Sequence, residues 1–104
     1  MKCPAKIHAY GRDYQIELAS TNPELEPRYA GRINHRALLI TLNQNYPDAS
    51  IRETALHELL HIIEVNSGLN LKESQIEAFS NGLFAALSDN PELVQWMFER
   101  KERK

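Results

Sequence analysis

The sequence contains one cysteine, four glycines and no long hydrophobic run. Because Cys3 has no partner, no intrachain disulfide can form, and a reducing cytoplasm is the expected compartment. No apolar stretch approaches the roughly 18 residues that a membrane-spanning helix needs, and the N-terminus lacks the apolar region of a signal peptide. The net charge of −2 provides no basic surface for nucleic acid or lipid headgroups. We therefore expect neither nucleic acid nor membrane as a partner.

The length of 104 residues fits one domain, covering residues 1–104, with a single modest core. Hydrophobic residues make up 42% and charged residues 25% of the chain, which is typical of a globular protein. The pattern changes near residue 48, from strand-like before it to helical after it. This order predicts an α+β domain in which β hairpins precede two or three helices.

Two hairpins are predicted in the first half. Residues 6–10 and 13–18 alternate apolar and polar side chains around a turn at Gly11 and Arg12, the pattern of a half-buried hairpin. Residues 29–34 and 37–42 repeat this pattern around His35 and Arg36. We therefore expect two antiparallel hairpins, joined by a loop over residues 20–27 that contains two prolines.

The second half begins with a capping-box pattern, Ser50 followed three residues later by Glu53. Apolar residues then recur at helical spacing as far as Ile63, and Gly68 is suited to end the helix in a left-handed conformation. A second helix is expected to start near Asn70, with Glu73 in a further capping box.

A third helix is expected after residue 90. Asn90 is a suitable cap and Pro91 a suitable first helical residue. The apolar side chains that follow, which include Trp96 and Phe98, should pack this helix onto the core.

The first predicted helix contains His57-Glu58-Leu59-Leu60-His61. Histidines four residues apart lie on the same face of a helix, so both imidazoles can bind one ion. Zinc accepts neutral imidazole nitrogen and lowers the pKa of a bound water to about 7. Glu58 is placed beside the pair, where it can accept the proton of that water and pass it to a leaving amine. The pattern thus predicts one catalytic zinc ion, with His57 and His61 as ligands.

A catalytic zinc site has three protein ligands and an open position. Glu64 lies on the motif helix itself and is interpreted as a solvated side chain. Glu73 has a capping role in the second helix. Glu77 lies in mid-helix, where an antiparallel return after Gly68 would bring it past the histidines. We predict Glu77 as the third ligand, with Glu73 as the alternative.

One turn after Glu77, Asn81 lies on the same helix face. A metal-bound histidine usually donates its second ring N–H to an oxygen acceptor. We predict that Asn81 supplies that oxygen.

These two segments together resemble the gluzincins. More closely, the chain resembles the small ImmA/IrrE-like zinc metallopeptidases of phages and bacteria. In these, Thr-x-x-His-Glu-x-x-His is followed on the next helix by a Glu and an Asn four residues apart. The matching segments here are Thr54–His61 and Glu77–Ala85, and the likeness covers roughly residues 31–91.

The resemblance implies a minimal zincin-like domain that hydrolyses peptide bonds, with His57, His61 and Glu77 on zinc and Glu58 as general base and acid. It also implies that the strand over residues 37–42 lies at the sheet edge, where it could pair with an extended peptide or protein substrate.

Gluzincins often supply a Tyr or His that stabilises the developing oxyanion. Tyr46 is the first candidate for that donor here, followed by His35 and Tyr29. A competing hypothesis is a catalytically silent, zinc-stabilised protein-binding or regulatory module of phage origin. In that case the same ligands would only hold the helices together. Retention of Glu58 argues against it, because a purely structural site does not need that carboxylate.

Overall fold

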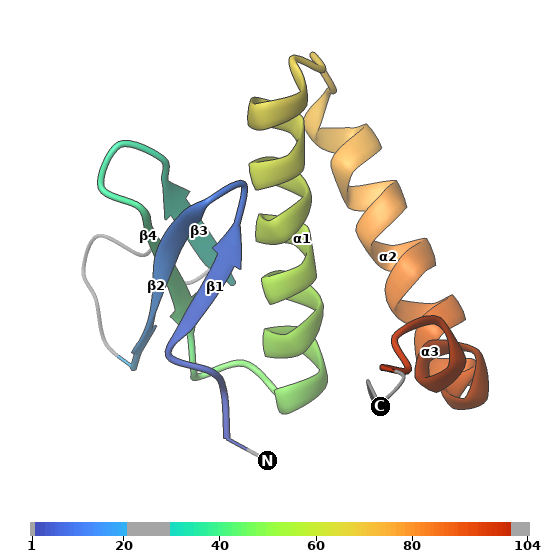
Figure 1. The fold of residues 1–104 in the computed structure, drawn as a ribbon. Coiled ribbons are helices and arrows are strands. Elements are labelled where there is room, and N and C mark those ends of the chain that lie inside the picture. The colour runs from blue at the N-terminus through green and yellow to red at the C-terminus, as the bar shows by residue number, and fades with distance from the viewer. Residues whose placement is uncertain (1, 21–29, 101–104) are drawn as a thin grey trace.

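The computed structural model describes residues 2–20 and 30–100, and they form a four-stranded sheet followed by helices (Figure 1). The strands are β1 (Lys6–Ala9), β2 (Arg12–Ala19), β3 (Gly31–Asn34) and β4 (Leu39–Asn43). The helices are α1 (Asp48–Ser67), α2 (Glu73–Asp89) and α3 (Pro91–Met97). The predicted α+β class is therefore confirmed.

The two hairpins form as predicted, but the sheet that joins them is mixed. β1 pairs with β2 and β3 pairs with β4, both antiparallel, whereas β2 pairs with β4 in parallel. The strand order is β1-β2-β4-β3. The expectation that residues 37–42 lie at the sheet edge is therefore wrong, because β4 is internal and β3 forms the edge. The near-continuous apolar run of β4 reflects this central position.

The core lies between the sheet and α1. Tyr14, Ile40, Leu42 and Ile62 are fully buried, and they form one cluster. β4 contributes two of these side chains, and Ile62 of α1 packs against them. The contact of α1 with β3 and β4 fixes the helix that carries the His-Glu-x-x-His motif against the internal and edge strands of the sheet.

The start of α1 differs from the prediction. The helix begins at Asp48, after Pro47, and no side chain caps its N-terminus. Ser50 lies inside the first turn, and its carbonyl accepts a hydrogen bond from Thr54 Oγ1 at 2.7 Å. A proline before the helix and an acidic residue in its first turn are both compatible with a helix start, so the capping-box pattern misplaced it. Gly68 ends α1 in the left-handed conformation, as predicted, with φ of 71°.

The predicted cap of the second helix was also misplaced. α2 starts at Glu73 rather than near Asn70, and the backbone N–H of Lys72 donates to Gln75 Oε1 at 2.8 Å. Glu73 is therefore the first helical residue, and its carboxylate is not needed for a capping box.

The last helix does not pack on the core. α3 begins at Pro91, as predicted, but it contacts α2, at the end far from the sheet (Figure 1). It buries no residue, and Trp96 and Phe98 are each 72% exposed. Asn90 donates to the carbonyl of Ala86 at 2.8 Å, so its side chain contacts α2 rather than capping α3. No helix within residues 2–20 and 30–100 is long and apolar enough to span a membrane.

Candidate metal centre

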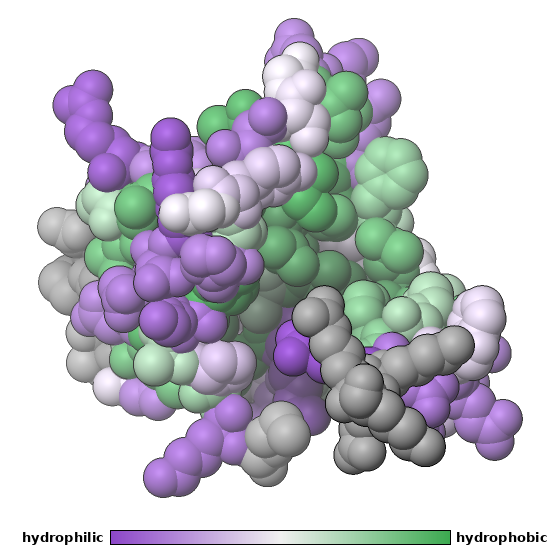
Figure 2. Space-filling view, in the orientation of Figure 1, coloured by the Kyte–Doolittle hydropathy of each residue, from purple (hydrophilic) through white to green (hydrophobic). Residues whose placement is uncertain are grey.

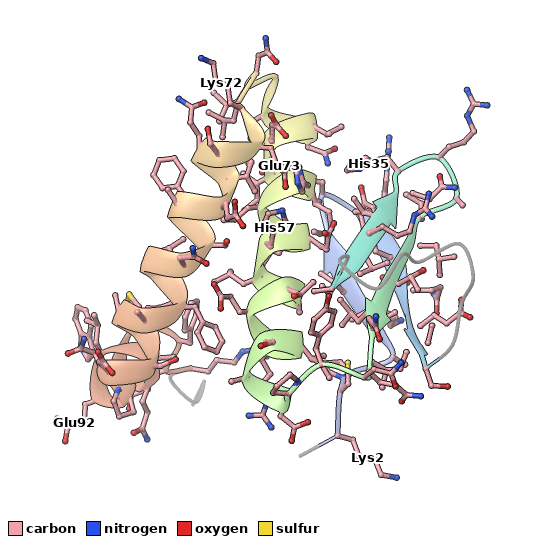
Figure 3. The ribbon with its side chains drawn as sticks, turned by 180° about the vertical axis from the view of Figure 1, so that it is seen from behind. Lys2, His35, His57, Lys72, Glu73 and Glu92 are labelled. Atoms are coloured by element: carbon pink, nitrogen blue, oxygen red, sulfur yellow. The ribbon has the colours of Figure 1, made fainter. Side chains whose placement is uncertain are left out.

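Two histidines of α1 and one glutamate of α2 converge at the interface between these helices (Figure 3). His57 Nε2 lies 2.7 Å from Glu73 Oε1, and His61 Nε2 lies 3.1 Å from Glu73 Oε2. The three potential ligand atoms all lie within 4.8 Å of one another. The motif spacing thus brings both imidazoles to one carboxylate, and the His57, His61 and Glu73 group could hold a metal ion.

The position of Glu73 follows from the short connection between the helices. Gly68 reverses the chain, and α2 returns beside α1 after residues 69–72. Glu73 is the first residue of α2, so its carboxylate extends from the helix start to both imidazoles. The group that could hold a metal ion therefore contains Glu73, the alternative considered above, while the assignment of Glu77 as a ligand stays a prediction. Glu77 lies one turn further along α2 and lines the adjacent cavity, but it does not belong to the three-residue group.

Each imidazole also has a neighbour at its other nitrogen. His57 Nδ1 lies 3.5 Å from Ser80 Oγ, a hydroxyl that donates to the carbonyl of Glu77 at 3.1 Å. Ser80 is 1% exposed. The predicted acceptor, Asn81, is exposed and lines the cavity, so the residue that contacts His57 is its neighbour Ser80. The contact of Ser80 with His57 could not be predicted from a single sequence, because the burial of Ser80 depends on the rotation of α2 relative to α1.

The side chain of Glu64 lies beside the second imidazole, that of His61. Glu64 Oε1 lies 3.3 Å from His61 Nδ1, and its side chain is only 14% exposed. Its interpretation as a solvated side chain was therefore wrong. Its spacing of three residues after His61 was the available signal, because residues three apart on a helix are neighbours.

Glu58, the central carboxylate of the motif, is 4% exposed. Within the described part of the chain, its Oε2 atom is buried without a hydrogen-bond partner. Burial raises the pKa of this carboxyl group, while His61 and His57 partly offset that effect. A buried carboxylate oxygen without a partner costs free energy, so a structural role alone does not account for Glu58.

A cavity of about 360 Å³ opens at this group. Its walls come from α1, from α2 and from the start of the edge strand β3. At β3 there is no room for a side chain: a Cβ atom on Gly31 would lie 2.7 Å from Thr54 Cγ2 and 2.9 Å from the carbonyl oxygen of Thr41. The described residues lining the cavity are Ala30, Gly31, Ser50, Glu53, Thr54, His57, Glu58, Glu73, Glu77, Ser80 and Asn81.

The three candidates for an oxyanion donor have different positions. Tyr46 lies before α1, and it is not among the described residues that line the cavity. His35 lies in the β3–β4 turn (Figure 3); burial, followed by the charge of His61, lowers its pKa. Tyr29 is outside the described residues. The assignment of Tyr46 to the oxyanion stays a prediction.

Comparisons with known proteins give no family for this chain: no family model, no curated protein and no solved structure matches it. The interpretation of the site therefore depends on its own residues and geometry.

Proposed function

We propose that this protein is a zinc-dependent metallopeptidase, with His57, His61 and Glu73 as the metal ligands. Two imidazoles and one carboxylate are a donor set of catalytic zinc sites, which keep a further position open for water or substrate. The donor atoms lie within 4.8 Å of one another, which suits a single ion. An accessible cavity beside them is the space that such a substrate would need.

The observation that carries this proposal is the buried carboxylate of Glu58 beside the three-residue group, whose Oε2 atom has no hydrogen-bond partner among the described residues. A bound zinc ion would supply a Lewis acid that polarises the peptide carbonyl and makes a water molecule more acidic. Glu58 would accept the proton of that water and donate it to the leaving amine. Burial raises the pKa of this carboxyl group above its ordinary value, which makes the group a stronger proton acceptor than a solvated glutamate.

The edge strand β3 supports a peptide as the substrate. Among the described strands, β3 pairs with β4 alone, and Gly31 at its start lines the cavity together with Ala30. An extended peptide could add to this edge through backbone hydrogen bonds. Such pairing would place a peptide bond beside Glu58 without requiring a deep cleft, which a chain of 104 residues cannot easily build.

The test combines metal content with peptide cleavage. The purified protein is loaded with zinc, and the retained metal is measured together with cleavage of a mixed peptide pool, read by mass spectrometry. We expect about one zinc ion per chain, cleavage by the parent, and no cleavage by Glu58→Gln with zinc retained. Glu53→Gln is the matched control, since Glu53 lines the same cavity on the same helix. Equal cleavage by Glu58→Gln and the parent would reject the mechanism.

The alternative function is a catalytically silent, metal-stabilised module that binds another protein. The observation that favours it is the exposed apolar surface of the helices (Figure 2). Phe79 is 56% exposed on α2, and Trp96 and Phe98 are more exposed still. The same experiment separates the two functions: one zinc per chain without cleavage of any peptide by the parent would favour the silent module.

A further inference from the structure

Glu64 joins the proposed metal ligands to the connection between α1 and α2. Its Oε1 atom lies 3.3 Å from His61 Nδ1, and its Oε2 atom accepts the backbone N–H of Leu71 at 2.7 Å. The side chain is only 14% exposed. A largely buried carboxylate that contacts two groups with its two oxygens is held in one orientation, because turning it would break a contact at either end.

The two contacts of Glu64 lead to different elements. His61 lies one turn earlier on α1, while Leu71 belongs to the connection and precedes Glu73 by two residues. Glu73 is the residue whose oxygens face both imidazoles. One oxygen of Glu64 therefore contacts the proposed ligand His61, and the other accepts a hydrogen bond from Leu71 in the connection that leads to Glu73.

Metal binding would fix which atom donates in the contact between His61 Nδ1 and Glu64 Oε1. An imidazole that binds a metal ion through Nε2 has its proton on Nδ1, and an oxygen acceptor at Nδ1 fixes both the tautomer and the ring orientation. Glu64 Oε1 is that acceptor for His61. A glutamine cannot replace both functions. If its oxygen accepts from Leu71, its NH₂ group faces Nδ1 and favours the tautomer with a proton on Nε2, which blocks metal binding.

We propose that Glu64 is a positioning residue of the metal centre. It orients His61 for metal binding and couples that orientation to the connection that places Glu73. This inference depends on the metal site proposed above, and it adds a residue that controls both metal affinity and the order of the helix connection.

The first test compares the zinc affinity of the parent, Glu64→Gln and Glu53→Gln, measured by competition with a chromophoric chelator. We expect Glu64→Gln to weaken zinc binding about 10- to 100-fold, the usual effect of losing such a partner. Glu53→Gln should stay within about twofold of the parent, because Glu53 lines the cavity but does not belong to the three-residue group. Equal affinities for Glu64→Gln and the parent would overturn the proposal.

The second test uses the unmodified chain and does not depend on whether a variant folds. In NMR spectra we expect zinc to give a slowly exchanging ring Nδ1–H signal for His61 and to slow exchange of the Leu71 amide. If zinc binds but neither signal changes, Glu64 does not couple the two elements. If the parent binds no zinc, the proposed metal site itself fails, so the two failures are distinguishable.

Discussion

Glu73 Oε1 lies 2.7 Å from His57 Nε2, although the two residues are 16 positions apart and belong to different helices. The contact closes a group of three potential ligands that the motif helix alone leaves incomplete. Glu77 lines the same cavity one turn further along α2. Substitutions of Glu73 and Glu77 can therefore be compared to test which of the two binds the metal.

Replacing Glu73 by alanine should weaken zinc binding more than any other substitution on α2. Loss of a direct ligand should exceed the roughly 100-fold effect of losing a surrounding partner. Glu77→Ala is the matched control, and we expect it to bind zinc within a few-fold of the parent. Calorimetric titration of the metal-free proteins measures both. The opposite order of affinities would restore Glu77 as the ligand.

Replacing Glu58 by glutamine should stabilise the metal-free protein at pH 7. The carboxylate is buried, and one of its oxygens has no hydrogen-bond partner within residues 2–20 and 30–100. Burying a charged group costs more free energy than burying a neutral one. We expect a gain of roughly 1 kcal/mol, in the range typical of removing a strained functional group, measured by urea denaturation with chelator present.

The same urea denaturation on Glu53→Gln provides the comparison for Glu58. The side chain of Glu53 is only partly buried, so its neutralisation should change the free energy of unfolding by less than about 0.5 kcal/mol. A Glu58→Gln protein that is less stable than the parent would mean that the carboxylate has a structural role, which would weaken the argument for a catalytic one.

Much of the architecture was predictable from local patterns. Alternation in residues 6–18 and helical spacing after residue 50 are period signals that a single sequence carries. The left-handed position of Gly68 follows from its lack of a side chain. The parallel pairing of β2 with β4 was not predicted, because the apolar run of β4 indicates a buried internal strand without identifying the strand beside it.

The two histidines of the site were predictable for the same reason, since their spacing of four is fixed by the helix. The third member of the possible metal-binding group was not predictable, because its identity depends on where α2 begins. A start near Asn70 gave Glu73 a capping role and made Glu77 the better ligand. The actual start at Glu73 frees that carboxylate. A shift of one helical turn thus changes which glutamate faces the imidazoles.

Replacing Gly31 by alanine should destabilise the protein by about 1–3 kcal/mol, the usual cost of overpacking. The added Cβ would lie 2.7 Å from Thr54 Cγ2 and 2.9 Å from the backbone oxygen of Thr41. Thermal or urea unfolding measures the loss. Adding Thr54→Ser removes only the first clash, so we expect the double variant to recover part of the stability, relative to Thr54→Ser alone.

Gly82→Ala is the control for Gly31, because nothing lies within 4 Å of a Cβ atom at that exposed helical position. An alanine there should stabilise the protein, by up to about 1 kcal/mol, through its better helix propensity. If both alanine variants changed stability in the same direction, the tight approach of β3 to α1 would not be the cause of the Gly31 effect.

The stability of the first hairpin should depend on pH through Asp13. The hydrogen bond from His8, at 2.7 Å, and then that from Lys6, at 3.3 Å, lower the pKa of this carboxyl group below its ordinary value of 3.8. The folded state therefore holds Asp13 ionised at pH values where the unfolded chain binds a proton. The resulting stabilisation is fully present above pH 3.8 and is lost as the pH falls through the lowered pKa.

Asp13→Asn should remove this part of the pH dependence. Urea denaturation of the parent and the variant between pH 2 and 6 should give a stability difference that is largest at the upper end and shrinks on acidification. Because Asp13 is exposed and distant in sequence from the motif, zinc affinity at pH 7 should be the same in both proteins. A stability difference that stayed constant across this range would show that the carboxylate charge does not contribute, and that only side-chain shape matters at this position.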